Sequence, residues 1–404
     1  MTQGHYQHDR WDTVLFVLSL GGLFLAVTAF AGLLLAAALA LLQRDTGTAS
    51  GSLWLAVAVL ATGAVGFPGA YLGLRSLLGH PPPKPLSLTS RVTWIILLLT
   101  FAAALGVGYL AFRDGFLPDI LGPLAHVLAG ASPILLVVWL ALRWGRALPL
   151  RRILGQFMAG LWIVPILALV LEGILLLPIL ILLVLGMTLA PEGRALIELL
   201  SSGRAVSPAI VEGYAIDIVT RPWFLIPVFV YLCGIAPAVE EVIKTLPVWP
   251  FLRRRIKVGD AFQAGVIGGG GYALFEALFQ TQAGDGWAGI MIARGGVSLM
   301  HAFTAALTCW SIGAASVEGK RWPRVVAAYL GSVAIHAVWN AGALGIGLAR
   351  FLREGRGMAL PEWLPASLVD HAPVALGVIA AVSLLGVVVL SLRLRRAEEP
   401  PAPD

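Results

Sequence analysis

Apolar runs long enough to cross a lipid bilayer recur along this chain of 404 residues. A transmembrane helix needs about 20 predominantly apolar residues. Because lipid offers the backbone no hydrogen-bond partners, spanning segments must be helices or closed barrels, and apolar runs of this length exclude a barrel. Charged residues make up only 12% of the chain, whereas a typical soluble domain has about 25%. The sequence therefore predicts an all-α, polytopic integral membrane helical bundle.

The apolar runs predict about ten transmembrane helices. The fifth is long enough for one helix or two, since Pro165 and Pro178 could split it, and we expect one long span. The segment 191–221 is polar, and its leucine spacing indicates a short interfacial helix. The expected spans cover, in order, about 13–42, 52–78, 92–112, 117–142, 155–190, 222–249, 260–282, 287–316, 325–349 and 373–392.

The distribution of basic residues predicts the orientation. With both termini in the cytoplasm, most of the 28 Lys and Arg residues fall in cytoplasmic loops, as the positive-inside rule requires. These loops account for the net charge of +6, so the charge does not indicate a nucleic-acid partner. We expect a multi-pass protein of the inner membrane of a bacterial cell, with the bilayer as its surroundings. The sequence leaves the oligomeric state open.

Polar groups within the spans predict three regions. Residues 1–221 form an N-terminal membrane region of about five spans and an extracytoplasmic loop, whose role the sequence leaves open. Residues 222–349 form a core of four membrane helices that contain the ionisable groups, and residues 350–404 supply the last span and a cytoplasmic tail.

The sixth span contains two adjacent carboxylates and a lysine in Glu240-Glu241-Val-Ile-Lys244. One charge at the centre of a membrane helix costs about 2.5–3.5 kcal/mol on insertion scales, so three together indicate a functional role. Glu240 and Lys244 are four residues apart and are expected on one helix face. Because adjacent carboxylates cannot both ionise cheaply, we expect Lys244 to favour an ionised Glu240, with Glu241 in support.

The next three spans carry further polar groups at a similar predicted depth. Glu276 lies in the seventh span, His301 in the eighth, and His336 and Asn340, four residues apart, in the ninth. These side chains could therefore converge with the glutamate pair in the interior of one bundle. His126, in the fourth span, has no polar neighbour at helical spacing and is expected to be a packing residue.

This set of side chains suits the attack of water on a carbonyl carbon. A carboxylate can act as the base, histidines can donate or accept protons, and an amide can stabilise an oxyanion. The sequence lacks two other hydrolase motifs. It has no His-Glu-x-x-His motif of helical zinc proteases, and no Gly-x-Ser-x-Gly motif of serine hydrolases with a plausible base. The glycines at 268–271 lack the Lys and Ser or Thr of a phosphate loop, and are expected to allow close helix packing.

Four motifs on successive spans resemble the PrsW family of intramembrane proteases, which is similar to the wider group of CAAX and bacteriocin-processing proteases. The resemblance covers roughly 225–345. The motifs read Glu240-Glu241-Val-Ile-Lys244, Gly269-Gly-Gly-Tyr-Ala-Leu-Phe-Glu276, Arg294-Gly-Gly-Val-Ser-Leu-Met-His301 and His336-Ala-Val-Trp-Asn340.

The resemblance implies an endopeptidase that cleaves membrane-anchored proteins. One carboxylate of the glutamate pair would activate water, and His336 and Asn340 would stabilise the oxyanion. Lys244 and Arg294 would be supporting residues, Arg294 either orienting a carboxylate or extending to the interface. The chain departs from the wider group at Glu276, where relatives often have histidine. It also departs from a minimal family member by its first five spans, which match nothing known, so the substrate stays open.

Two mechanisms and two other functions remain as alternatives. Zinc could be bound by Glu276, His301 and His336 with Glu240 as the base, but a mechanism without a cofactor is favoured. A proton- or cation-coupled transporter is a second interpretation, although the polar residues are confined to one half of the chain and no repeat relates the halves. A catalytically idle membrane scaffold is the third.

Overall fold

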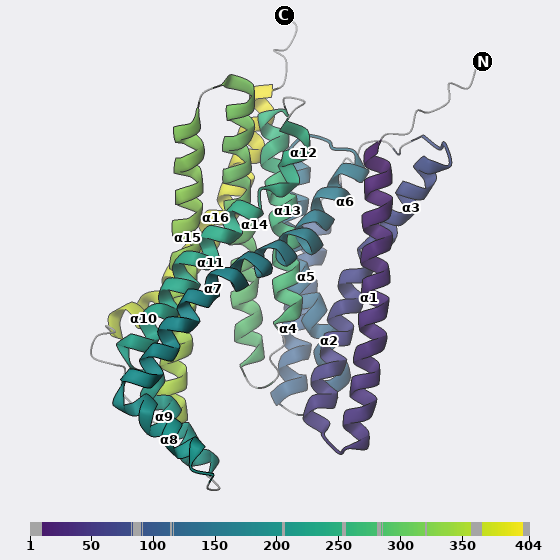
Figure 1. Ribbon diagram of the computed structural model, residues 1–404. Coiled ribbons are helices and arrows are strands. Elements are labelled where there is room, and N and C mark those ends of the chain that lie inside the picture. Colours follow the sequence, from purple (N-terminus) through teal and green to yellow (C-terminus); the bar gives the residue numbers. More distant parts are fainter. Residues whose placement is uncertain are drawn as a thin grey trace, which may run out of the picture. The chain divides into compact units, whose positions relative to one another are not determined.

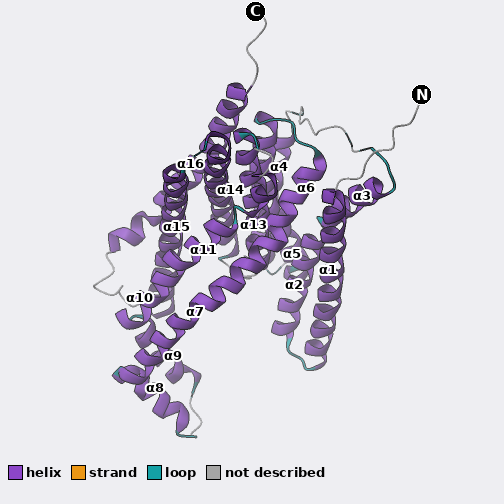
Figure 2. Ribbon diagram, turned by 45° about the horizontal axis from the view of Figure 1, so that its top comes forward, coloured by secondary structure: helices purple, strands orange, loops and turns teal. Residues whose placement is uncertain are grey.

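The computed structural model of the protein is helical throughout the part that it describes, and Figure 2 shows helices and loops there without strands. This agrees with the predicted all-α bundle. The described residues are 10–81, 83, 90, 92–113, 115, 117–203, 207–252, 256–280, 284, 286–319, 321–356 and 366–398.

The chain divides into two compact units, each made from several segments of the sequence. The first unit comprises Met1–Pro165, Lys244–Ser332 and Ile379–Asp404, and the second comprises Ile166–Ile243 and Val333–Val378. Three long helices pass from one unit into the other, so the predicted regions of the sequence do not coincide with these units. The three are α7 (Val164–Leu189), α15 (Trp322–Arg356) and α16 (Ala366–Glu398).

The first unit is built around α13, which packs against α5, α6 and α14 (Figure 1). Its core consists of buried aliphatic side chains such as Ile134, Val137, Ile267 and Ala302. The elements that lie wholly in this unit are α1 (Arg10–Leu42), α2 (Thr46–Ala64), α3 (Gly66–Leu77), α4 (Thr93–Arg113), α5 (Pro118–Trp144), α6 (Leu150–Met158), the π-helix η1 (Ala159–Ile163), the 3-10 helix η3 (Leu246–Val248), α12 (Trp249–Leu252), α13 (Val258–Phe279) and α14 (Trp287–Glu318).

Glycines in α13 allow the backbone of α14 to approach closely. A Cβ atom added at Gly265 would lie 2.5 Å from Ala306 Cα, and one added at Gly269 would lie 2.6 Å from the His301 carbonyl oxygen. Neither gap accommodates a side chain, so larger residues would push the helices apart. The prediction that the glycine run serves helix packing is therefore confirmed, and this packing holds α14 at the level of His301.

The second unit contains a short helical hairpin and the helix of the glutamate pair. The predicted interfacial helix is α8 (Pro191–Ser201), and a second short helix, α9 (Pro208–Val219), was not predicted. Arg221 and Glu192 form an ion pair of 2.6 Å beside these helices. The remaining elements are α10 (Pro222–Val230), the π-helix η2 (Tyr231–Ile235) and α11 (Ala236–Ile243), followed in the chain by the second unit's parts of α15 and α16.

Nine helical segments of the described chain are long and apolar enough to cross a membrane. The seventh predicted span, 260–282, is the one that is not among them, and it corresponds to α13, which has the length but not the apolar composition. Its glycines, Gln263 and Glu276 lower its mean hydropathy, and it is buried among other helices instead of facing lipid. The described part of the chain is thus a polytopic helical bundle that contains nine clear spans and this buried, less apolar helix.

Two predicted spans differ in detail from the observed helices. The fifth is continuous from Leu150 to Leu189, as expected for one helix, although a π-helical turn interrupts its regular α-helical bonding. The sixth, predicted at 222–249, is confirmed as the apolar span Pro222–Leu252. It is not regular throughout, because α11 ends at Ile243 and Lys244 lies in the turn that follows. Pro247 lacks the N–H group that would bond the Ile243 carbonyl oxygen, and this stops the helix.

Candidate functional site

The helix of the glutamate pair contains a π-helical turn directly before the carboxylates. The Ala236 N–H donates to the Tyr231 carbonyl five residues earlier, not to Leu232 four residues earlier. Leu232 would need the N–H of residue 237 in the same π pattern, but Pro237 has none. The Leu232 oxygen instead accepts a bond of 2.8 Å from the Asn340 side-chain amide. Asn340 therefore compensates for a bond that this helix cannot make itself.

His336 lies between the two carboxylates of the pair. Its Nδ1 atom is 2.9 Å from Glu241 Oε1, a hydrogen bond, and its Nε2 atom is 3.9 Å from Glu240 Oε2. All three side chains are buried, Glu241 completely. The 3.9 Å separation exceeds a direct hydrogen bond, but a single small ligand such as water could contact both atoms. The second unit thus holds an imidazole that one carboxylate orients and that faces another.

A second group of ionisable side chains lies in the first unit. The Lys244 Nζ atom is 2.7 Å from His301 Nδ1, and His301 Nε2 is 2.7 Å from Glu276 Oε2. Arg294 approaches the same Glu276 oxygen at 3.5 Å. Of the two roles expected for Arg294, the geometry agrees with orienting a carboxylate.

The contacts of His301 indicate its tautomer. An ammonium group can only donate, so Nδ1 accepts from Lys244 and the ring proton lies on Nε2, where it is donated to Glu276. The Tyr272 ring packs edge-on against His301, with centroids 5.3 Å apart, and Lys244 Nζ lies 4.4 Å from the centre of the same ring. These contacts hold a fully buried lysine, which would otherwise be very costly.

The predicted residues therefore fall into two groups. The second unit brings together Glu240, Glu241, His336 and Asn340, and the first brings together Lys244, Glu276, Arg294 and His301. Neither Tyr272 nor the Leu232 carbonyl was predicted. Tyr272 stands four residues before Glu276 on one face of α13, so helical spacing alone could have identified it. The Leu232 carbonyl had no sequence signal beyond Pro237.

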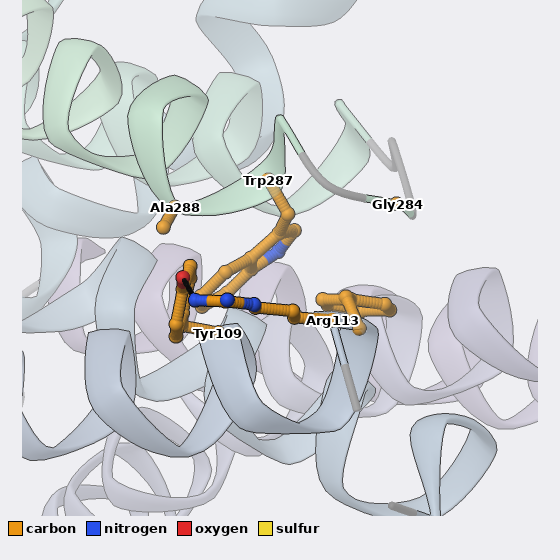
Figure 3. A pocket seen from close by; sticks show the side chains of 6 residues that line it. Tyr109, Arg113, Gly284, Trp287 and Ala288 are labelled. Carbon is orange, nitrogen blue, oxygen red and sulfur yellow. Dashed lines mark hydrogen bonds between the residues drawn. The ribbon is translucent and has the colours of Figure 1, made fainter. Parts of the chain in front are cut away.

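His126 has the structural role that was expected for it. Its Nδ1 atom accepts a bond of 3.3 Å from Trp287 Nε1, and its Nε2 atom lies 3.3 Å from the Leu278 carbonyl oxygen. Beside Trp287, at the ends of α4 and α14, lies a cavity of about 260 Å³ (Figure 3). Its lining includes none of the predicted catalytic residues, and its charged group, Arg113, is hydrogen-bonded to the Tyr109 hydroxyl.

The donor atoms of the second unit are of the kind that zinc prefers. Catalytic zinc is bound tetrahedrally by three protein ligands, usually histidine and carboxylate, at about 2.0–2.2 Å, so two of its ligand atoms lie about 3.3–3.6 Å apart. The His336 Nε2 and Glu240 Oε2 atoms, 3.9 Å apart, are near that spacing. Glu241, bonded to the other ring nitrogen, is the carboxylate partner that metal-bound histidines commonly have. These residues fit a metal ion by their chemistry.

In contrast, Glu276 and His301 have cationic neighbours. Lys244 donates to His301 and Arg294 approaches Glu276. A metal bound by both residues would have to displace the Lys244 ammonium from Nδ1 or the Glu276 carboxylate from Nε2. The first unit therefore fits a buried charge network better than a metal centre.

The structure defines a polytopic membrane protein. Its helices bury ionisable side chains, namely glutamates, histidines and a lysine. The model of the PrsW family intramembrane metalloprotease matches residues 148–354, just over half of the chain. The chain belongs to this family. The match contains all four motifs that carried the resemblance and begins well before them, at residue 148. No curated protein and no solved structure matches the chain.

Proposed function

We propose that the protein is an intramembrane endopeptidase that hydrolyses peptide bonds of membrane-anchored proteins. The observation that carries this proposal is His336, placed between the buried carboxylates of Glu240 and Glu241. Membership of an intramembrane protease family supports the same activity. We also place the protein in the inner membrane of a bacterial cell, as the resemblance implies.

Glu240 is the residue that activates water. A water molecule between Glu240 Oε2 and His336 Nε2 would give up a proton to the carboxylate as its oxygen attacks the peptide carbonyl carbon. The proton then passes to the nitrogen of the leaving amine as the carbon–nitrogen bond breaks. Glu241 holds the imidazole through Nδ1, and His336 stabilises the charge that develops on the carbonyl oxygen.

The charge network of the first unit is proposed to be required as well. Lys244, His301, Glu276 and Arg294 form a connected chain of donors and acceptors that is expensive to bury. Such a chain can provide protons and positive electrostatic potential during hydrolysis. It is also the observation that most favours the alternative function, a proton pathway, because linked ionisable groups can relay protons through a membrane.

A metal ion is the alternative means of activating water. His336 and Glu240 would hold it, with Glu241 as the carboxylate partner of His336, and it would lower the pKa of its bound water. We favour the glutamate mechanism without metal, because Lys244 and Arg294 make Glu276 and His301 poor additional ligands. Zinc that copurifies stoichiometrically and is lost together with cleavage upon chelation would reverse this preference.

The decisive experiment replaces each carboxylate of the pair by its amide. Glu240→Gln should abolish cleavage of membrane proteins in cells, and Glu241→Gln should reduce it strongly, because each amide keeps the size but loses the charge. Glu198→Gln is the matched control, since Glu198 is exposed on α8 in the same unit. Unchanged processing in both variants of the pair would contradict the proposal, and proton flux through liposomes that Glu276→Gln stops would favour the pathway.

A further inference from the structure

The helix of the glutamate pair has an unmet hydrogen-bonding requirement that is encoded in its sequence. In an α-helix the Leu232 carbonyl would accept from the N–H of Ala236, but that N–H is bonded to Tyr231 in the π-helical turn. In a π-helix the donor would be residue 237, which is a proline. A backbone carbonyl left unsatisfied inside a membrane helix costs several kcal/mol, so the turn persists only with an outside donor.

Asn340 provides this donor from another helix. Its Nδ2 atom lies 2.8 Å from the Leu232 oxygen. Asn340 is also the only asparagine in the chain. One turn earlier on the same face of α15, His336 contacts Glu241. These two side chains therefore join α15 to the helix of the glutamate pair at two points, Glu241 and the Leu232 carbonyl.

We propose that Asn340 is a positioning residue that stabilises the π-helical turn and thereby sets the direction of Glu240 and Glu241. A π-helical turn contains one residue more than an α-helical turn, and each residue rotates an α-helix by about 100°. If the turn relaxed to α-helix, the carboxylates after it would rotate by about that angle relative to α10. Pro237 therefore leaves the Leu232 carbonyl without a donor within the helix, and Asn340 supplies the donor that keeps the π-helical turn stable.

This role differs from the oxyanion donor that the resemblance implies for Asn340. An oxyanion donor acts only on the substrate, so its loss lowers the rate whatever residue stands at 237. If the role of Asn340 is instead to donate to the Leu232 carbonyl oxygen, its loss should matter little once a backbone N–H of the same helix can donate to that oxygen. Pro237→Ala restores an N–H at 237, and it also lets Ala236 return to Leu232, so both routes satisfy the carbonyl.

The test is a double-mutant cycle on the thermal unfolding of the purified full-length protein in detergent. Asn340→Ala should lower the melting temperature by about 2 °C or more in the wild-type background, because it leaves a buried acceptor unsatisfied. In the Pro237→Ala background the same change should lower it by less than half as much. Gln263→Leu is the control, since Gln263 is a buried amide that bonds the Ala141 carbonyl, and its loss should be equal in both backgrounds.

Equal losses for Asn340→Ala in both backgrounds, or no loss in either, would overturn the proposal. If the Ala variant fails to fold, Asn340→Leu, which keeps the side-chain volume without the donor, is measured in the same cycle. The cycle does not depend on the proposed function, because it reads stability alone.

The activity measurement depends on the proposed function and completes the test. At a temperature at which every variant is folded, Asn340→Leu should lower kcat about tenfold or more with KM little changed, because misplaced catalytic groups lose rate and not binding. A folded variant with normal kcat would show a merely structural bond and contradict the positioning role.

Discussion

At the scale of single residues, the buried charges are organised by short chains of hydrogen bonds. His336 and His301 each have a carboxylate on one ring nitrogen, Glu241 and Glu276 respectively. The other nitrogen differs, since that of His301 meets the Lys244 ammonium and that of His336 faces Glu240. The two histidines therefore have different surroundings, and of the two only His336 faces a carboxylate across a gap that water could occupy.

His336→Gln is predicted to reduce cleavage by about 10²-fold or more, because removal of one group that stabilises the charge on the carbonyl oxygen costs about 10²–10³-fold in rate. Cleavage of a membrane-anchored reporter in cells measures it. His371→Gln serves as the control, since His371 is exposed on α16. Retention of full activity by the His336 variant would exclude the mechanism proposed for the pair.

Lys244→Met is predicted to destabilise the protein much more than Arg294→Gln. Lys244 is fully buried, and its loss leaves the buried Nδ1 atom of His301 without its donor, which costs about 1–3 kcal/mol and more where a charged group is involved. Arg294 is partly exposed and 3.5 Å from its partner, so its loss should cost about 1 kcal/mol or less. Melting temperatures of the two purified variants give the comparison, and the reverse order would show that the Lys244 contacts contribute little.

At the scale of elements, the close approach of α13 and α14 positions one group of charged residues. Glu276 is two turns after Gly269 on α13, and the His301 carbonyl is the atom nearest to Gly269. The helix pair is thus held together just where its polar side chains meet. The helix α11 is also held by its neighbours. A π-helical turn precedes it, and α15 contacts this helix through His336 and Asn340.

Gly269→Ala is predicted to lower stability by about 1–3 kcal/mol, because the added methyl group would lie 2.6 Å from the His301 carbonyl. The resulting shift of α14 should reduce cleavage at the same time. Gly289→Ala on α14 is the matched control, since a Cβ there meets nothing within 4 Å. That control should be neutral or slightly stabilising, as expected for glycine replaced by alanine in an open helix. Equal melting temperatures for both variants would contradict the packing argument.

At the scale of the whole molecule, α13 decides the topology. Nine clear spans would place the two termini on opposite sides of the membrane, whereas ten place them on the same side. The 22 residues of α13 span about 33 Å, long enough for the hydrocarbon core. Polar and glycine residues are tolerated there because neighbouring helices, and not lipid, surround it.

We therefore predict that α13 crosses the membrane and that both termini are cytoplasmic. Reporter domains that are active on only one side of the membrane, fused to each terminus in separate experiments, should give the same cytoplasmic result. A fusion after Phe279 should report the opposite side from one before Val258. Termini on opposite sides would show that α13 does not cross.

The class of fold, nearly all the helix positions and the candidate charged residues could be predicted from the sequence. Hydropathy and the high cost of charge in lipid are local properties, so they can be read along the chain. The sequence also marked Pro237 and the α13 glycines as unusual, without saying what they contact.

The partners of those residues could not be predicted, because they depend on how the helices pack in three dimensions. It placed Lys244 on His301 instead of within the helix of Glu240, and it placed Asn340 on the Leu232 carbonyl. Both outcomes depend on breaks in regular helix geometry, the end of α11 at Ile243 and the π-helical turn at Tyr231–Ile235. A regular helical spacing cannot predict them, because one extra residue in a turn or an early helix end changes the direction of every side chain that follows.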